Sequence, residues 1–198
     1  MDGYYSYDEV LETLEELSDS EFVHGVHSIG QTRSGNDINY IHIEDNDGIE
    51  NRPGILLVGG VAAEPMSVTA AIMFAQRLVS ALELGTDDDL KFTAKTTSVY
   101  ILPVLNVDTY ADFSEEYPRG GEDSYRSKNL VTTDCDDPDL TGVSLDRNFA
   151  FKWAENDVGS SDDPCSEIYR GRSEFSENET EFLRDAFDDK DIALVVVI

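Results

Sequence analysis

Three short apolar runs constrain the fold of this chain more than any other feature. They are "GILLVGG" at residues 54–60, "TSVYILPVLN" at 97–106 and "IALVVVI" at 192–198. A continuous apolar run of this length is typical of a strand that is buried on both faces of a sheet. Helical patterns lie between the runs. The sequence therefore predicts an α/β sheet that is covered by helices on both faces.

The segments between these runs divide into helical and strand patterns. Residues 5–20, 67–85 and 176–187 are predicted to be helices, and residues 22–30 and 38–45 are predicted to be strands. Gly85 follows the second helical pattern and is expected to end that helix. Ser176 and Glu179 have the spacing of a capping box, so the third helix is expected to begin there.

The charge balance limits the possible partners. The 198 residues include 14 Lys and Arg against 42 Asp and Glu, a formal net charge of −28. Nucleic acids and anionic membranes require basic patches, so neither is an expected partner. Two interpretations of the acidity stay open: a solvated, self-repelling surface, or adaptation to high salt or to a calcium-rich exterior. No continuous apolar run approaches 18 residues, so no membrane span is expected, and the first residues lack the pattern of a signal peptide.

The two cysteines, Cys135 and Cys165, lie in polar, loop-like sequence. Neither belongs to a C-x-x-C motif and no histidine is near, so a zinc site built on them is not expected. A disulfide is predicted instead, which implies an extracellular or other oxidising compartment. Asn178 begins an N-x-T pattern and is a candidate glycosylation site.

Seven segments resemble one family, in that family's order. They are "YDEVLETLEEL", "SIGQTRSGNDI", "GILLVGGVAAEPMS", "VYILPVLNVDTY", "YRSKNL", "GVSLDRNFAFKW" and "PCSEIYRGRSEFSENET". They resemble the zinc metallocarboxypeptidases of the pancreatic A and B type. The last segment is the most specific, because it resembles the motif PCSE-x-Y-x-G-x-x-pFSEPET. The resemblance covers residues 1–198 as one partial domain, about the N-terminal two-thirds of a family catalytic domain.

This resemblance implies a twisted mixed sheet with zinc at the carboxyl ends of central strands, and an activity that removes the C-terminal residue from peptides. The Cys135–Cys165 pair also resembles a disulfide of the family. Under this resemblance the sequence stops after a central strand of the family sheet, at Ile198. The resemblance therefore implies that further strands and helices would follow that strand.

The zinc ligands implied by the resemblance are mostly missing. Glu64 matches the family's glutamate ligand, but Val61 occupies the position of the first histidine. The distant histidine would follow Ile198. The family places the segment of His24 and His27 away from the metal, and His42 is interpreted as a structural residue. Because a catalytic zinc needs about three protein ligands, Glu64 is predicted to be the remnant of a metal site, and no cofactor is expected unless the family activity is retained with zinc.

The substrate-binding groups also depart from the family pattern. Leu130 stands where the resemblance implies an arginine that stabilises the oxyanion. Asp146 and Arg147 stand where it implies an Asn-Arg pair that binds the terminal carboxylate of the substrate. Arg147 matches, whereas the charge of Asp146 would repel a carboxylate. Ser144 replaces an aspartate that is expected to support a zinc ligand, and the family's general base would lie beyond Ile198.

Three functions follow from these departures. The first is a catalytically inactive, carboxypeptidase-like protein with a structural or binding role in an assembly. The second is an active zinc carboxypeptidase, completed by a segment outside this chain. The third is an acidic cation-binding module, with a weak site formed by Glu64 and Asp146. For the first, a protein partner or a second chain is expected to cover residues Ile192 to Ile198, because exposed apolar strands are pairing sites.

Overall fold

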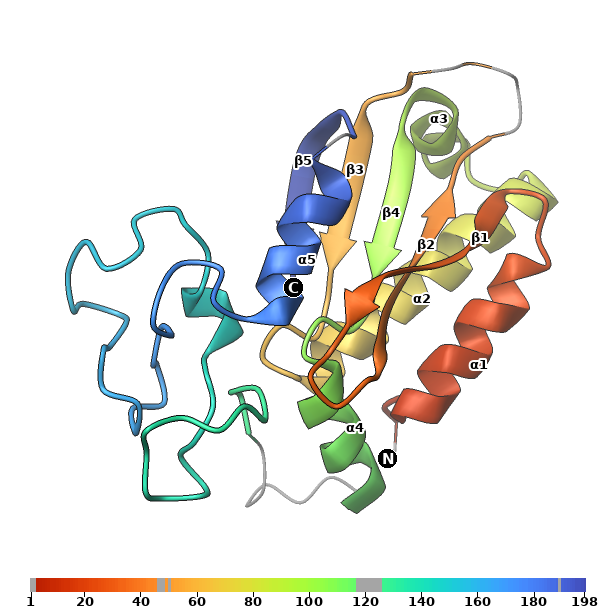
Figure 1. Cartoon of the computed structure of the whole chain (residues 1–198). Coiled ribbons are helices and arrows are strands. Elements are labelled where there is room, and N and C mark those ends of the chain that lie inside the picture. The colour runs from red at the N-terminus through yellow and green to blue at the C-terminus, as the bar shows by residue number, and fades with distance from the viewer. Residues whose placement is uncertain (1–2, 46–48, 50, 117–125, 189) are drawn as a thin grey trace.

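A five-stranded sheet forms the centre of the protein (Figure 1). The computed structural model describes residues 3–45, 49, 51–116, 126–188 and 190–198. The strands are β1 (Val23–Gln31), β2 (Asp37–Ile43), β3 (Gly54–Val58), β4 (Ser98–Leu102) and β5 (Ile192–Val197). The helices are α1 (Tyr7–Ser18), α2 (Pro65–Leu84), α3 (Asp88–Thr96), α4 (Val107–Glu116) and α5 (Asn178–Phe187), together with the short 3₁₀ helix η2 (Leu145–Arg147).

The strand pairing makes the sheet mixed, as the family resemblance implied. The order across the sheet is β1-β2-β4-β3-β5. The pairs β1–β2 and β2–β4 are antiparallel, whereas β3 pairs in parallel with both β4 and β5. The carboxyl ends of β3, β4 and β5 therefore meet at one edge, which is where open α/β sheets place their functional groups.

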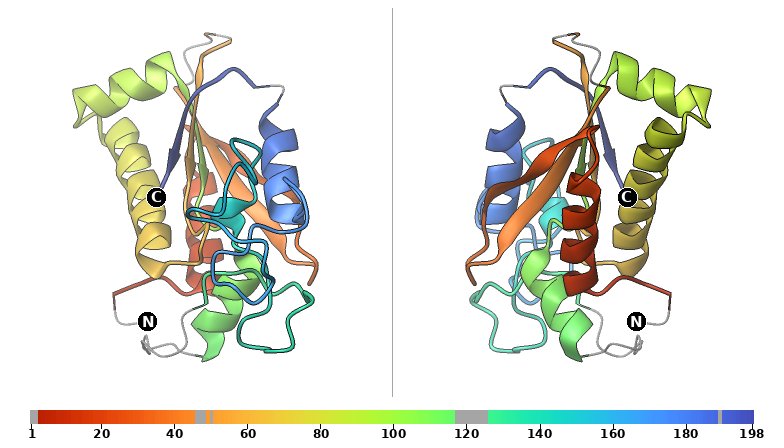
Figure 2. Two further views of the ribbon diagram at one scale, coloured as in Figure 1. Left: turned by 90° about the vertical axis from the view of Figure 1, so that its left-hand side faces the viewer. Right: turned by 90° about the vertical axis from the view of Figure 1, so that its right-hand side faces the viewer.

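Helices cover both faces of the sheet, which confirms the prediction from the apolar runs. Helix α2 packs on one face and α5 on the other, with the strands between them (Figure 2). Helix α1 lies on the α2 face and buries Val10 and Leu14. By length and composition alone α2 could cross a membrane, but half of its apolar window is buried inside this fold, as in a core helix. Gly85 ends α2 with φ 63°, as expected.

Strand β5 differs from its predicted state. It is an edge strand with β3 as its neighbour, and not a strand buried on both faces. Leu194, Val195, Val197 and Ile198 are each at least 40% exposed. The physical reason is that, among the described elements, only β3 packs closely against β5, so the side chains on the two faces of β5 stay in contact with water.

One prediction at the helices is wrong. Ser176 and Glu179 do not form a capping box: Glu177 is the N-cap residue of α5 and makes no side-chain capping bond. Ser176 Oγ donates instead to the Glu177 carboxylate at 2.8 Å. A capping box is instead present at α1, between Ser6 and Glu9. Helices α3 and α4 were not predicted; both are short, with 9 and 10 residues.

The Cys135–Cys165 disulfide is present, with the two Cα atoms 5.1 Å apart. It joins two positions of the irregular segment that lies between α4 and α5. The prediction from the loop context and the family resemblance is thus confirmed. A disulfide is consistent with an oxidising compartment.

Candidate functional site

The turn between β3 and α2, "GGVAAEPMS", lies at the carboxyl edge of the sheet. A Cβ atom added to Gly59 would lie 2.6 Å from the carbonyl oxygen of Pro103, so the backbone approach requires glycine. The Gly60 amide donates to Ser67 Oγ at 3.0 Å, and Ser67 Oγ donates to the Glu64 carbonyl at 2.8 Å. These contacts hold the turn between β3 and α2 in place.

Val61 and Glu64 have different environments within this turn. Val61 is 5% exposed and packs into the main hydrophobic core. Its side chain has no lone pair for a metal. Glu64 is the N-cap residue of α2, is half-buried, and makes no side-chain capping bond. Its carboxylate has no ion pair with any residue that the structure describes, so it is one isolated acidic group at the sheet edge.

Ser144, Asp146 and Arg147 lie together at η2. Ser144 Oγ donates to Asp146 Oδ1 at 2.6 Å. Arg147 Nε lies 3.3 Å from Asp146 Oδ2, and both side chains are about 40% exposed. Asp146 therefore places its own carboxylate against the arginine that the family resemblance assigns to the substrate carboxylate.

Asn148 fixes this segment to the start of α5. Its side chain is fully buried, and Nδ2 donates to the carbonyls of Arg170 (2.9 Å) and Ser173 (3.1 Å). Its Oδ1 accepts from the Glu177 amide (3.3 Å) and from Thr180 Oγ1 (2.6 Å). One side chain thus connects the η2 segment, the loop before α5 and the first turn of α5.

Lys128 is a second buried polar side chain that connects segments of the loop region. It is 2% exposed, and Nζ donates to the carbonyls of Leu140, Pro164 (2.9 Å) and Ser166 (3.0 Å). Burial lowers the pKa of the Lys128 ammonium. Sequence reasoning assigned no role to Lys128 or Asn148, because nothing in a polar loop sequence indicates which polar side chain points inward.

The other predicted site positions, Leu130 and Asn178, lie outside the β3–α2 turn and outside η2. Leu130 is half-buried and directly follows Asn129, whose amide donates to the buried Glu177 carboxylate at 2.9 Å. Asn178 is the first residue of α5 and is half-buried, with Nδ2 donating to the Gln31 carbonyl at 3.4 Å. No hydrogen bond or ion pair joins Glu64 to the Asp146–Arg147 pair.

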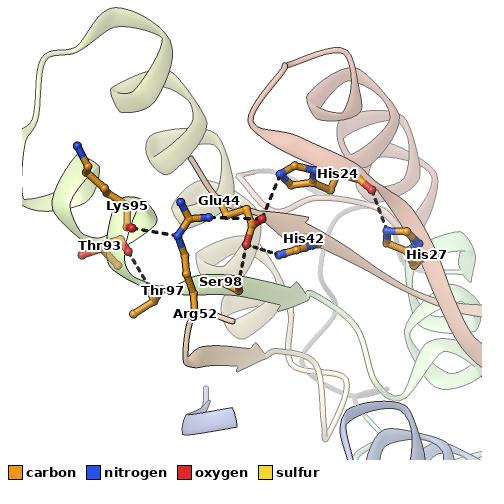
Figure 3. Close-up of polar contacts among 9 residues, drawn as sticks. All are labelled: His24, His27, His42, Glu44, Arg52, Thr93, Lys95, Thr97 and Ser98. Atoms are coloured by element: carbon orange, nitrogen blue, oxygen red, sulfur yellow. Dashed lines mark hydrogen bonds and ion pairs between the residues drawn. The ribbon is translucent and has the colours of Figure 1, made fainter. Parts of the chain in front are cut away.

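The three histidines lie away from this edge. Figure 3 shows His24 and His42 around the carboxylate of Glu44, at Nε2–O distances of 3.7 and 3.2 Å. Ser98 Oγ donates to the same carboxylate at 2.6 Å, and Arg52 lies 3.4 Å from it. Because Arg52 and Ser98 lie at the amino ends of β3 and β4, this cluster is at the opposite end of the parallel strands from Glu64.

Burial and neighbouring charges shift the pKa values of His42 and Glu44 in the histidine cluster. Burial lowers the pKa of His42, although the Glu44 carboxylate opposes that effect. Burial also raises the pKa of Glu44, but the Ser98 hydroxyl and the neighbouring His42 and Arg52 outweigh it, so the pKa of Glu44 is lowered. In the described part of the chain, no group of three or more His, Cys, Asp or Glu residues could hold a metal ion.

Comparison with known proteins identifies the family. The zinc carboxypeptidase family model matches residues 9–198. The chain belongs to the zinc carboxypeptidase family. Carboxypeptidase B of Helicoverpa zea is 33% identical over 190 residues, and carboxypeptidase B of Astacus astacus is 28% identical over 186. The alignments cover 93% and 92% of this chain but 41% and 56% of those relatives, so the chain spans about half their length.

Solved structures agree with this family assignment. The crystal structure of carboxypeptidase A from Helicoverpa armigera is 30% identical, with a TM-score of 0.79 over 99% of this chain and 46% of its own. The crystal structure of thrombin activatable fibrinolysis inhibitor matches with a TM-score of 0.84 at 23% identity, which shows the shared fold. The zinc of the family does not fit the residues present here, because Glu64 is one carboxylate beside an apolar, buried Val61.

Proposed function

We propose that this chain is a catalytically inactive zinc carboxypeptidase-like protein that acts by binding within an extracellular assembly. The observation that carries the proposal is the burial of Val61 in the hydrophobic core at the position of the first histidine ligand. A weakly held zinc ion could not supply the activated water that the family reaction needs. The internal Asp146–Arg147 pair supports the same proposal, because it opposes recognition of a substrate carboxylate.

Metal content and peptide hydrolysis test the proposal together. The purified chain is dialysed against zinc, its bound metal is measured, and unblocked peptides are followed by mass spectrometry. We expect substoichiometric zinc and no loss of C-terminal residues. The matched variant Val61→His restores the H-x-x-E spacing and is expected to retain more zinc than the wild type. One zinc per wild-type chain, with turnover that a chelator abolishes, would overturn the proposal.

A second candidate function is an active carboxypeptidase that another segment completes. The Ile198 amide donates to the Val58 carbonyl at 3.1 Å, so the carboxyl end of β5 lies beside the end of β3. A residue delivered beyond Ile198 would enter the edge that also holds Glu64. The zinc measurement separates this function from the first when it is repeated after addition of a segment that binds β5. Stoichiometric zinc in that complex would favour the active carboxypeptidase.

We also propose that a second polypeptide segment covers Ile192 to Ile198 by adding a strand beside β5. The exposed apolar residues of β5 support this, since bare strand edges promote association. Hydrogen exchange and size measurements on residues 1–198 test it. We expect weak protection of β5 and self-association, whereas a monomer with a strongly protected β5 would contradict the proposal.

A further inference from the structure

A pocket of about 430 Å³ lies around the loop that follows η2. Aromatic side chains of Phe149, Phe151 and Trp153 line it, together with Val158. Phe151 and Val158 are 86% and 88% exposed, the highest values among the exposed large apolar residues of the described chain. A water-exposed apolar pair at the mouth of a pocket is typical of an interaction site.

The pocket wall is held in a fixed shape. Trp153 Nε1 donates to the Arg170 carbonyl at 3.1 Å, and the Arg170 guanidinium lies 5.7 Å from the centre of the indole ring. Lys152 and Ala154 have φ values of 56° and 54°. Non-glycine residues seldom adopt this left-handed conformation, and such strain is concentrated at functional sites. The exposed apolar pair thus belongs to an ordered loop.

The charges around the pocket select the chemistry of its ligand. Its basic groups already face carboxylates: Arg147 is paired with Asp146, and Lys152 lies 3.2 Å from Glu155. Arg170, on the same wall, lies 2.9 Å from Asp157. Residues 146–163 contain five acidic and two basic side chains, so with Arg170 the local net charge is −2 within a chain of −28. The field at the pocket is therefore negative, which attracts cationic ligands and repels anionic ones.

We propose that this pocket binds a short basic and apolar peptide segment of a partner protein, one in which Lys or Arg alternates with Leu or Phe. The apolar side chains contact Phe151, Val158 and the aromatic wall, and the basic side chains lie near the acidic groups of residues 155–163. The proposal rests on the proposed binding function and names the partner chemistry for it. It differs from recognition of a peptide's C-terminal carboxylate, because it requires no free carboxylate.

Trp153, the single tryptophan of the chain, reports binding without a label. Its fluorescence is titrated with the amidated peptide Lys-Leu-Arg-Phe-Lys. The comparison peptides, also amidated, are Glu-Leu-Glu-Phe-Glu and Lys-Ser-Arg-Ser-Lys. We expect a saturable change with the first peptide, and at least about tenfold weaker binding of the other two, because neither matches both the apolar and the charged part of the site.

The double variant Phe151→Ser/Val158→Ser is expected to weaken binding about tenfold or more. Phe92→Ser is the matched control, because Phe92 is 68% exposed on α3 and lies outside the pocket; it should leave binding unchanged. Equal binding of the basic polar peptide, equal effects of both variants, or no fluorescence change would each overturn the inference. The same peptide with a free carboxyl end is incubated with zinc; loss of its final Lys would overturn the inactive function and leave the docking result intact.

Discussion

Replacing Glu179 by glutamine should stabilise the protein at alkaline pH, because this carboxyl group is buried on α5 and is 3% exposed. Burial raises its pKa from 4.5 to about 7, and the charges of Glu177 and Asp108 raise it as well, while its own amide and Asn129 oppose them. A folded-state pKa above the unfolded value means that stability is present below pH 4.5 and is lost as pH rises through 7. The difference between the two pKa values corresponds to about 3 kcal/mol.

Urea unfolding at pH 5 and pH 8 measures the effect. The glutamine variant does not ionise, so its free energy of unfolding relative to wild type should rise by about 2–3 kcal/mol between these two pH values. Glu181→Gln is the matched control, because Glu181 is exposed on the same helix; its relative stability should change by less than about 0.5 kcal/mol. A glutamine effect that is the same at both pH values would refute the assignment of a buried, neutral carboxyl group to Glu179.

Three further outcomes are expected. Because the pKa of His42 is lowered in the folded state, the unfolded chain binds this proton at a higher pH, so stability should fall as pH drops below about 6.5. The variant His42→Gln should reduce this loss of stability. The control variant His27→Gln, at an exposed position, should leave it unchanged. The double variant Cys135→Ser/Cys165→Ser should lose about 3–4 kcal/mol of unfolding free energy, measured with urea, and reductant should destabilise the wild type without affecting the variant. With a net charge of −28, the melting temperature should rise from 0.1 M to 1 M NaCl, as the Debye length falls from about 10 to about 3 Å; no rise would show that self-repulsion is negligible.

The sequence predicted those elements that a local pattern marks, either a run of apolar residues or a residue that ends a helix. The apolar runs identified β3, β4 and β5, and Gly85 identified the end of α2. The exposure of β5 could not be predicted from a local pattern, because the burial of a strand depends on which elements flank it in space. The packing of Lys128 and Asn148 was equally hidden, since both use backbone carbonyls that only the folded loops bring together.

The candidate site shows the same division. The family resemblance assigned roles to Val61, Glu64, Asp146 and Arg147. The structure places the first two in the turn after β3 and the other two at η2. The Ser144–Asp146 hydrogen bond could not be predicted, because it depends on the η2 geometry. The pocket around Phe151 was also missed, since an exposed aromatic residue in a loop carries no periodic signal.

Val61, Ser144 and Asp146, which differ from the residues that the family resemblance implies, each make favourable contacts in this fold. Val61 contributes apolar burial to a turn whose shape depends on Gly59 and Ser67, so the fold does not require an imidazole there. Asp146 supplies a carboxylate to Arg147, and Ser144 donates to that carboxylate. An incoming peptide carboxylate would have to compete with this internal one and face its charge. The exposed pair itself contributes only about 0–1 kcal/mol, so like-charge repulsion is the larger obstacle. The site is therefore organised around its own carboxylate, and a ligand without a free carboxyl group meets no such opposition.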